Sequence, residues 1–196
     1  MTETEICNAA LGRLGEAPIL SLTDTGATAR ACALHFKMTR DAVLRSHRWN
    51  FACKRGALAE IPTVPLFGWD HAFQLPADFL RVVEVNESED GAGNPWAVEQ
   101  DQLLTNDDAV NLVYVYRLED ASKFDPLFNE ALACKLAEKL ASTLRGSSSG
   151  TVDFAAEYER ITAPLARRVD ANESRGRKGM KPYRSMFVAA RGATVE

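Results

Sequence analysis

Histidine and carboxylate side chains are the groups in this sequence whose chemistry would suit catalysis or metal binding. The histidines are His35, His47 and His71, and the first two are twelve residues apart on one predicted helix. Side chains at that separation do not lie on adjacent turns, so they cannot share a metal ion. The C-terminus of a helix favours a cationic side chain, which accounts for His47 without a ligand. We therefore predict no histidine-based metal or catalytic site.

A group of carboxylates between residues 101 and 120 is the next candidate, as a cation site or a pair for acid–base chemistry. Its members are Asp101, Asp107, Asp108, Glu119 and Asp120. Their spacing matches no calcium-binding loop, and the segment 106–108 has the composition of a turn. We expect these side chains to be solvated turn residues.

Enzyme motifs are missing from the sequence. It contains no nucleophile elbow, phosphate-binding loop, dinucleotide-binding glycine pattern or zinc-protease helix motif. The cysteines, which are Cys7, Cys32, Cys53 and Cys134, form no Cys-x-x-Cys pair, and we expect reduced, buried thiols. Cys7, Cys32 and Cys134 lie within helical patterns. We predict a protein that is not an enzyme and uses no cofactor, with an unfamiliar hydrolase site as an open alternative.

Composition favours an ordinary globular protein. The chain has 196 residues, 46% of them hydrophobic and 26% charged, which is enough for one domain with a sizeable core. No apolar run approaches the roughly 18 residues that cross a membrane. The acidic start, residues 1–5, also lacks the apolar run of a signal peptide. These features predict a cytosolic product that has no targeting segment and no membrane partner.

Charge is distributed unevenly along the chain. The net charge is −4, but residues 175–196 carry six Lys and Arg against Glu196, which leaves −9 on residues 1–174. Apolar residues are interspersed among these cations, a composition that suits docking onto an acidic protein groove. The predicted docking arm consists of Arg175, Arg177, Lys178, Lys181, Tyr183, Arg184, Met186 and Phe187. Nucleic-acid binding is the alternative, because Lys and Arg neutralise phosphates; the chain would then be a cytosolic regulator or a nucleic-acid-binding module.

Helical periodicity dominates both ends of the chain. Residues 3–14 follow a capping box at Thr2 and Glu5, and residues 26–47 form a long helix with an apolar stripe that includes Leu34 and Met38. Asp125 caps a third helix, Thr151 caps a fourth, and Pro164 predicts a kink in the fourth. The residues expected in the core are Leu14, Trp49, Phe51, Phe128, Leu132, Leu136, Leu140, Tyr158 and Ile161.

The middle of the chain has strand character. β-branched and aromatic residues are concentrated at 80–85, 96–99 and 110–116, between segments rich in Pro and Gly. We predict an α+β fold, mainly α: a four-helix core with an inserted small antiparallel β-sheet and an extended C-terminal arm. The helical core comprises residues 1–55 and 120–174, the β-rich insertion 56–119, and the basic arm 175–196.

Three motifs occur in order within the first half of the chain. The segment 6–19 ends a short helix with Leu-Gly-Glu-Ala-Pro, Arg45 precedes Trp49-Asn50-Phe51, and residues 75–81 read Leu-Pro-Ala-Asp-Phe-Leu-Arg. Together they resemble the tail tubular protein A-like adaptors of short-tailed phages. The resemblance covers residues 3–85 by motif and 3–170 by the order of elements.

The resemblance implies a structural virion protein that is made in the host cytoplasm and works in the neck of the tail. Such head-to-tail adaptors form a ring, usually of twelve subunits, beneath the portal protein. Their helical layers pack between neighbours, the inserted sheet faces the tail nozzle protein, and the C-terminal segment reaches the portal. Double-stranded DNA passes through the ring without sequence readout, and an acidic body would let it slide.

Overall fold

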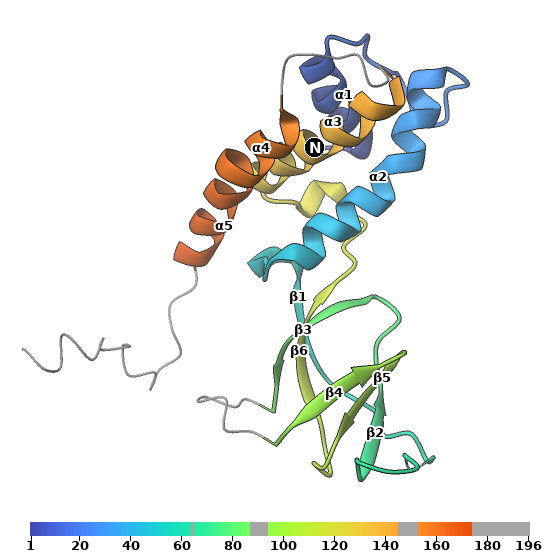
Figure 1. The fold of residues 1–196 in the computed structure, drawn as a ribbon, viewed down its shortest axis with the longest axis vertical. Coiled ribbons are helices and arrows are strands. Elements are labelled where there is room, and N and C mark those ends of the chain that lie inside the picture. The colour runs from blue at the N-terminus through green and yellow to red at the C-terminus, as the bar shows by residue number, and fades with distance from the viewer. Residues whose placement is uncertain (64, 87–93, 145–152, 174–196) are drawn as a thin grey trace, which may run out of the picture.

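The computed structural model describes residues 1–63, 65–86, 94–144 and 153–173, and these divide into a helical layer and two small β-sheets. Figure 1 shows the helices at one end of an elongated molecule and the sheets at the other. The predicted class, α+β and mainly α with an inserted antiparallel β region, is confirmed. No helix of the described segments is both long and apolar enough to cross a membrane.

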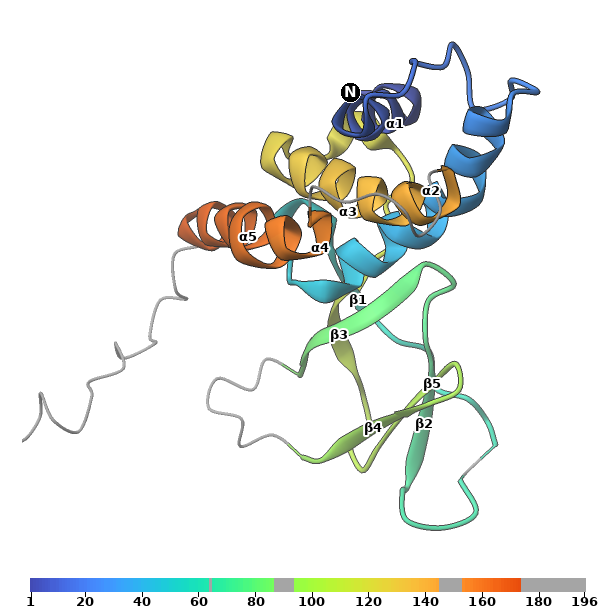
Figure 2. The ribbon, with the colours of Figure 1, turned by 45° about the horizontal axis from the view of Figure 1, so that its top comes forward.

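One helix occupies the centre of the helical layer. This helix, α3, packs against α1, α2 and the pair α4–α5, while α2 and α5 lie on opposite flanks (Figures 1 and 2). The helices are α1 (Glu3–Leu14), α2 (Ala27–Ser46), α3 (Pro126–Leu144), α4 (Phe154–Glu157) and α5 (Ala163–Asn172), with a π-helix, Tyr158–Thr162, joining the last two. A central α3 explains why its apolar residues recur on nearly every side of the helix.

The ends of the helices follow the predicted capping chemistry in two cases. Thr2 and Glu5 form a capping box at the start of α1, and Gly15 ends that helix in the left-handed conformation with φ 68°. Asp125 accepts hydrogen bonds from the backbone N–H groups of residues 127 and 128 at the start of α3. The fourth helix differs, since Asp153 caps it and Thr151 lies outside the described residues.

Two residues of the predicted apolar face of α2 are not buried. Leu34 and Met38 are 67% and 70% exposed, so their assignment to the packing stripe is wrong. The buried residues of α2 are Ala29, Ala31, Cys32, Phe36, Thr39, Arg40, Val43 and Leu44. They include a polar and a charged residue, and sequence periodicity counts such residues as solvent-facing.

The π-helix shifts the apolar stripe of the last helical segment. Phe154 and Tyr158 are buried as expected, but Ile161 is 61% exposed, so its place in the predicted core is wrong. A π-turn contains one extra residue, so the inward positions after Tyr158 move by one, to Thr162 and Ala166. Pro164 lacks an N–H group, which favours such an irregular turn just before it.

Six strands form two antiparallel sheets where a single sheet was predicted. The larger sheet has the order β1 (Cys53–Ala57), β6 (Asn111–Tyr116), β3 (Phe79–Val85), and the smaller has β2 (His71–Gln74), β5 (Gln102–Thr105), β4 (Trp96–Glu99). Strands β1, β2 and β5 were not predicted. The smaller sheet, called the distal sheet below, lies at the end of the molecule away from the helices (Figure 1).

Aromatic residues close the base of the helical layer. Phe128 is the centre of this cluster, with ring centroids 5.1 Å from Trp49, 5.1 Å from Phe51 and 5.0 Å from Phe124. Trp49 is buried and donates its indole N–H to the carbonyl of Val43, 3.0 Å away. Phe51 is only partly buried, whereas Leu14, Leu132, Leu136, Leu140 and Tyr158 are buried in the same core.

A polar seam joins the helical layer to the larger sheet. Arg40 of α2 is only 2% exposed, and its Nε lies 2.9 Å from Oδ1 of Asp41. The other oxygen of Asp41 accepts a hydrogen bond from Nε of Arg117, at 2.9 Å. Arg45, also on α2, donates to the carbonyl of Leu80 in β3. The orientation of α2 against the sheet is therefore set by directional charged contacts.

We predict that Arg40→Ala lowers the free energy of unfolding by about 2 kcal/mol, because it removes a buried side chain together with its ion pairs. Urea denaturation at neutral pH measures the effect. The matched control is Arg30→Ala, an exposed arginine on the same helix, which should stay within about 0.5 kcal/mol of the parent. Equal stabilities of the two variants would contradict the assigned role of Arg40.

Candidate interaction surfaces

The predicted docking arm lies outside the described residues. All eight of its residues, Arg175, Arg177, Lys178, Lys181, Tyr183, Arg184, Met186 and Phe187, follow residue 173. Its contact with a partner stays a prediction from composition and position. The surfaces described below come from the remainder of the chain.

Each histidine is occupied by a different local contact. His35 lies 2.8 Å from the hydroxyl of Thr143, and His71 lies 2.7 Å from a carboxylate oxygen of Glu60. Nε2 of His47 lies 3.5 Å from Asp170, a buried carboxylate that also accepts the backbone N–H of Asn50. These contacts tie helices or strands together, and among the described residues no three His, Cys, Asp or Glu side chains are placed to hold a metal ion.

The carboxylates between residues 101 and 120 are dispersed over separate turns. Asp107 accepts hydrogen bonds from the amides of Asn86 and Asn94, and Asp101 accepts one from Gln74. Asp120 bonds Ser122, and this hydrogen bond holds the pKa of Asp120 below its usual value. Glu119 and Asp108 contact Arg40 and His71 respectively. This arrangement matches the expected turn chemistry and provides no paired-carboxylate site.

The cysteines behave as apolar core residues. Cys7, Cys32 and Cys134 are buried, Cys53 is half-buried, and all four are free thiols. Burial raises the pKa of the Cys134 and Cys53 thiols, so the reactive thiolate is disfavoured at neutral pH.

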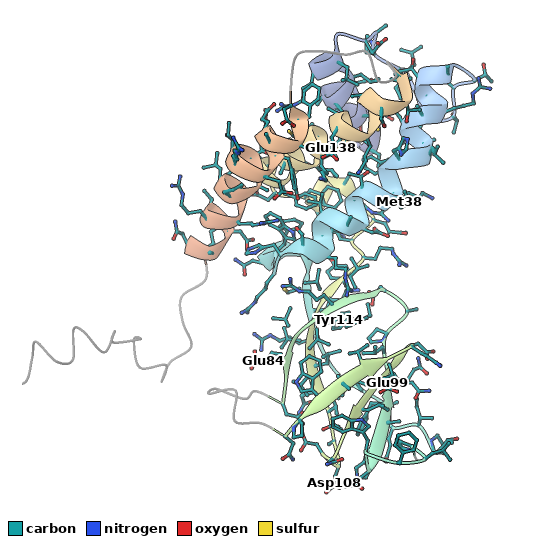
Figure 3. All side chains as sticks on the ribbon, in the orientation of Figure 1. Met38, Glu84, Glu99, Asp108, Tyr114 and Glu138 are labelled. Atoms are coloured by element: carbon teal, nitrogen blue, oxygen red, sulfur yellow. The ribbon has the colours of Figure 1, made fainter. Side chains whose placement is uncertain are left out.

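Apolar side chains are exposed on both flanks of the helical layer. Leu34 and Met38 are one turn apart on α2, and Figure 3 labels Met38 on the flank opposite α5. On the other flank, Ile161 and Leu165 are 61% and 38% exposed and are also four residues apart. Each pair can cover part of a neighbouring molecule, and because the flanks are opposed, one molecule can contact two neighbours.

A third apolar surface lies at the tip of the distal sheet. The loop that joins β1 to β2 carries Leu66 and Phe67, which are 98% and 86% exposed. A hollow of about 590 Å³ separates this loop from the outer face of the distal sheet, and Trp69, Ala72 and Leu104 contribute to its lining. Contiguous exposed apolar side chains make this loop a candidate contact site.

The sequence around this tip is strongly acidic. From residue 56 to residue 110 it contains eleven Asp and Glu, and Arg81 is its only Lys or Arg. Figure 3 labels Glu99 on the distal sheet and Asp108 at the far end of the molecule. At the base of the loop Glu60 and Asp108 contact His71, and Glu99 lines the hollow, so the apolar tip lies beside carboxylates.

Sequence reasoning missed both the flank pairs and the tip. The tip has a recognisable signature, because no charged residue occurs between Glu60 and Asp70 while five large apolar or aromatic residues do. The flank pairs have no such signature in the sequence, because Leu34 and Ile161 fit an apolar helical stripe just as well as the buried residues do. Only the tertiary packing distinguishes an inward stripe from an outward one.

We predict that acidification destabilises the protein partly through His47. Burial is the main cause that lowers the pKa of His47 from 6.5, and Arg167 and Arg81 add to it while Asp170 opposes it. The unfolded chain thus takes up this proton at higher pH than the folded chain, so the stability is present above pH 6.5 and is lost below it. Thermal melting between about pH 7.5 and 5.5 should show a smaller loss for His47→Gln than for the parent.

His71 provides the internal check on that experiment. Its contact with Glu60 raises its pKa, which gives the opposite pH dependence, and it is present in both proteins. The difference between the two melting curves therefore reports His47 alone. Parallel curves for the parent and His47→Gln would refute the assignment.

No protein-family model and no curated protein matches this chain. The likeness to phage adaptors therefore stays a prediction that depends on the motifs within the chain.

Proposed function

We propose that this protein is a head-to-tail adaptor of a short-tailed phage, one subunit of a ring that joins the portal protein to the tail nozzle. The ring, which would usually hold twelve copies, forms part of the channel through which double-stranded DNA leaves the capsid. The protein would act in the virion after synthesis in the host cytoplasm. The observation that carries the proposal is the pair of exposed apolar surfaces on opposite flanks of the helical layer.

Opposed surfaces favour a ring over a symmetric dimer. A two-fold dimer uses one self-complementary patch on each copy, whereas a ring needs two different patches that meet head to tail. Leu34 and Met38 would provide one patch and Ile161 and Leu165 the other. The central α3 would keep the two patches in a fixed relation, because both α2 and α5 pack against it.

Two of the three segments that carry the resemblance meet in space. Arg45, from the second motif, donates a hydrogen bond to the carbonyl of Leu80, from the third. Asp78 of the third motif accepts a bond from the hydroxyl of Tyr114, and its carbonyl accepts the backbone N–H of Arg117. The second and third motifs thus form one junction between α2 and the larger sheet, which supports the adaptor proposal.

The net negative charge of residues 1–174 is compatible with a protein that surrounds DNA without binding it tightly. Residues 1–174 carry a net −9, which opposes broad contact with phosphates. The basic segment from residue 175 onward would instead dock on an acidic groove of the portal. This assignment favours the adaptor over the nucleic-acid-binding alternative, in which the basic tail would contact phosphates.

We predict that Leu34→Glu/Met38→Glu weakens contact between neighbouring copies at least about tenfold, since a carboxylate would be buried against an apolar patch. The mass of the complex with portal protein, measured by native mass spectrometry, should fall below full occupancy. Leu20→Glu is the matched control, because Leu20 is 95% exposed and belongs to neither patch. Full rings from the double variant would refute the role of this flank.

We also predict that deleting residues 175–196 abolishes binding to portal protein and leaves a folded body. Circular dichroism and thermal melting check the fold, and co-sedimentation with portal checks binding. The same proteins should show no salt-sensitive binding to duplex DNA, a property that the regulator alternative requires. Normal portal binding by the shortened chain would exclude the docking arm.

A further inference from the structure

We propose that the tip of the loop between β1 and β2 is an apolar anchor for a second protein, and that the partner offers an apolar pocket rimmed by Lys and Arg. Leu66 and Phe67 are the anchor residues. The inference rests on the proposed function in one respect, since it takes the partner to be the nozzle protein on the side of the ring away from the portal.

The base of the loop is held firmly against the distal sheet. The backbone N–H of Ile61 bonds the carbonyl of Ala72 at 2.8 Å, and that of Gln74 bonds the carbonyl of Ala59 at 3.0 Å. His71 adds a side-chain contact to Glu60 at 2.7 Å. The two ends of the loop are therefore paired like a hairpin, which fixes where the tip stands.

The tip itself is shaped by glycine. Gly68 has φ 83°, a left-handed conformation that a residue with a side chain rarely adopts. The turn follows directly after Leu66 and Phe67, whose side chains are 98% and 86% exposed. An anchor that is already positioned loses less conformational entropy on binding, so more of its apolar burial is available as affinity.

Position and charge together identify the chemistry of the partner. The loop lies at the end of the molecule remote from the helices in both Figures 1 and 2, so a neighbour that packs on the helical flanks leaves it uncovered. Glu60 and Asp70 bound the apolar run in the sequence, Glu99 lines the hollow beside it, and from residue 56 to 80 the sequence has no Lys or Arg. A partner with a basic rim complements these carboxylates, whereas an anionic lipid surface would be repelled.

The direct test compares nozzle binding by rings of the parent chain and of Leu66→Ser/Phe67→Ser. Losing two apolar side chains that the complex would bury should weaken binding at least about tenfold, measured by surface plasmon resonance on portal–adaptor complexes. Leu20→Ser is the matched control, an equally exposed leucine between α1 and α2, and it should bind like the parent. Equal binding by the double variant and this control would overturn the proposal.

A charge variant tests the basic rim separately. Glu99 is exposed and lines the hollow, so Glu99→Lys reverses a charge beside the anchor. This change should slow association at low salt, and the effect should disappear at about 1 M salt, where charges are screened within a few ångströms. Faster association, or an effect that is independent of salt, would show that the partner has no basic rim.

Three further outcomes distinguish the anchor proposal from membrane binding and from the adaptor function. If vesicles of phosphatidylcholine and phosphatidylglycerol bind the parent but not Leu66→Ser/Phe67→Ser, the anchor serves a membrane and the protein-docking proposal fails. If the parent binds neither portal nor nozzle, the adaptor function fails. If the parent and the double variant bind portal and nozzle equally well, the adaptor function stands and only the anchor is rejected.

Discussion

The structure depends on α2, which packs both against α3 and against the larger sheet. One side of α2 packs against α3, and its C-terminal half meets the larger sheet through Asp41 and Arg45. Arg40, at 2% exposure, has its charge balanced by carboxylates from α1, from α2 and from the segment after β6. A buried guanidinium must be paired to be tolerated, so these three segments are constrained to meet at one place.

Local chemistry allowed the helix ends and the fold class to be predicted. The capping box at Thr2 and the cap at Asp125 act within a few residues of themselves, so the sequence contains all the information they need. Strands β1 and β5 were missed because they include residues such as Lys54, Gly56 and Gln102, which are not typical of strands, and β2 has no β-branched residue. Their existence depends on partners far along the chain, which no local pattern encodes.

The surfaces were harder to predict than the core because a helix has two candidate stripes. In the last helical segment the π-helix after Glu157 moves the inward positions by one residue, so Ile161 and Leu165 face outward. On α2, burial of Arg40 has a similar consequence, since a charged residue takes an inward place while Met38 stays outside. In both cases apolar side chains are left exposed that a contact with a neighbour would bury.

The exposed apolar residues lie at three separate places on the molecule, so each could contact a different neighbour. Two pairs lie on opposed flanks of a helical layer that α3 makes rigid, and the third lies at the far tip on a loop braced by strand-like pairing. If the tip docks as proposed, the carboxylates beside it would favour a basic partner over a Debye length of about 8 Å, before contact. The apolar side chains would act only at contact and would supply most of the binding free energy there. Long-range selection and short-range contact would then involve different groups on the same surface, which the uncharged run between Glu60 and Asp70 keeps apart in the sequence.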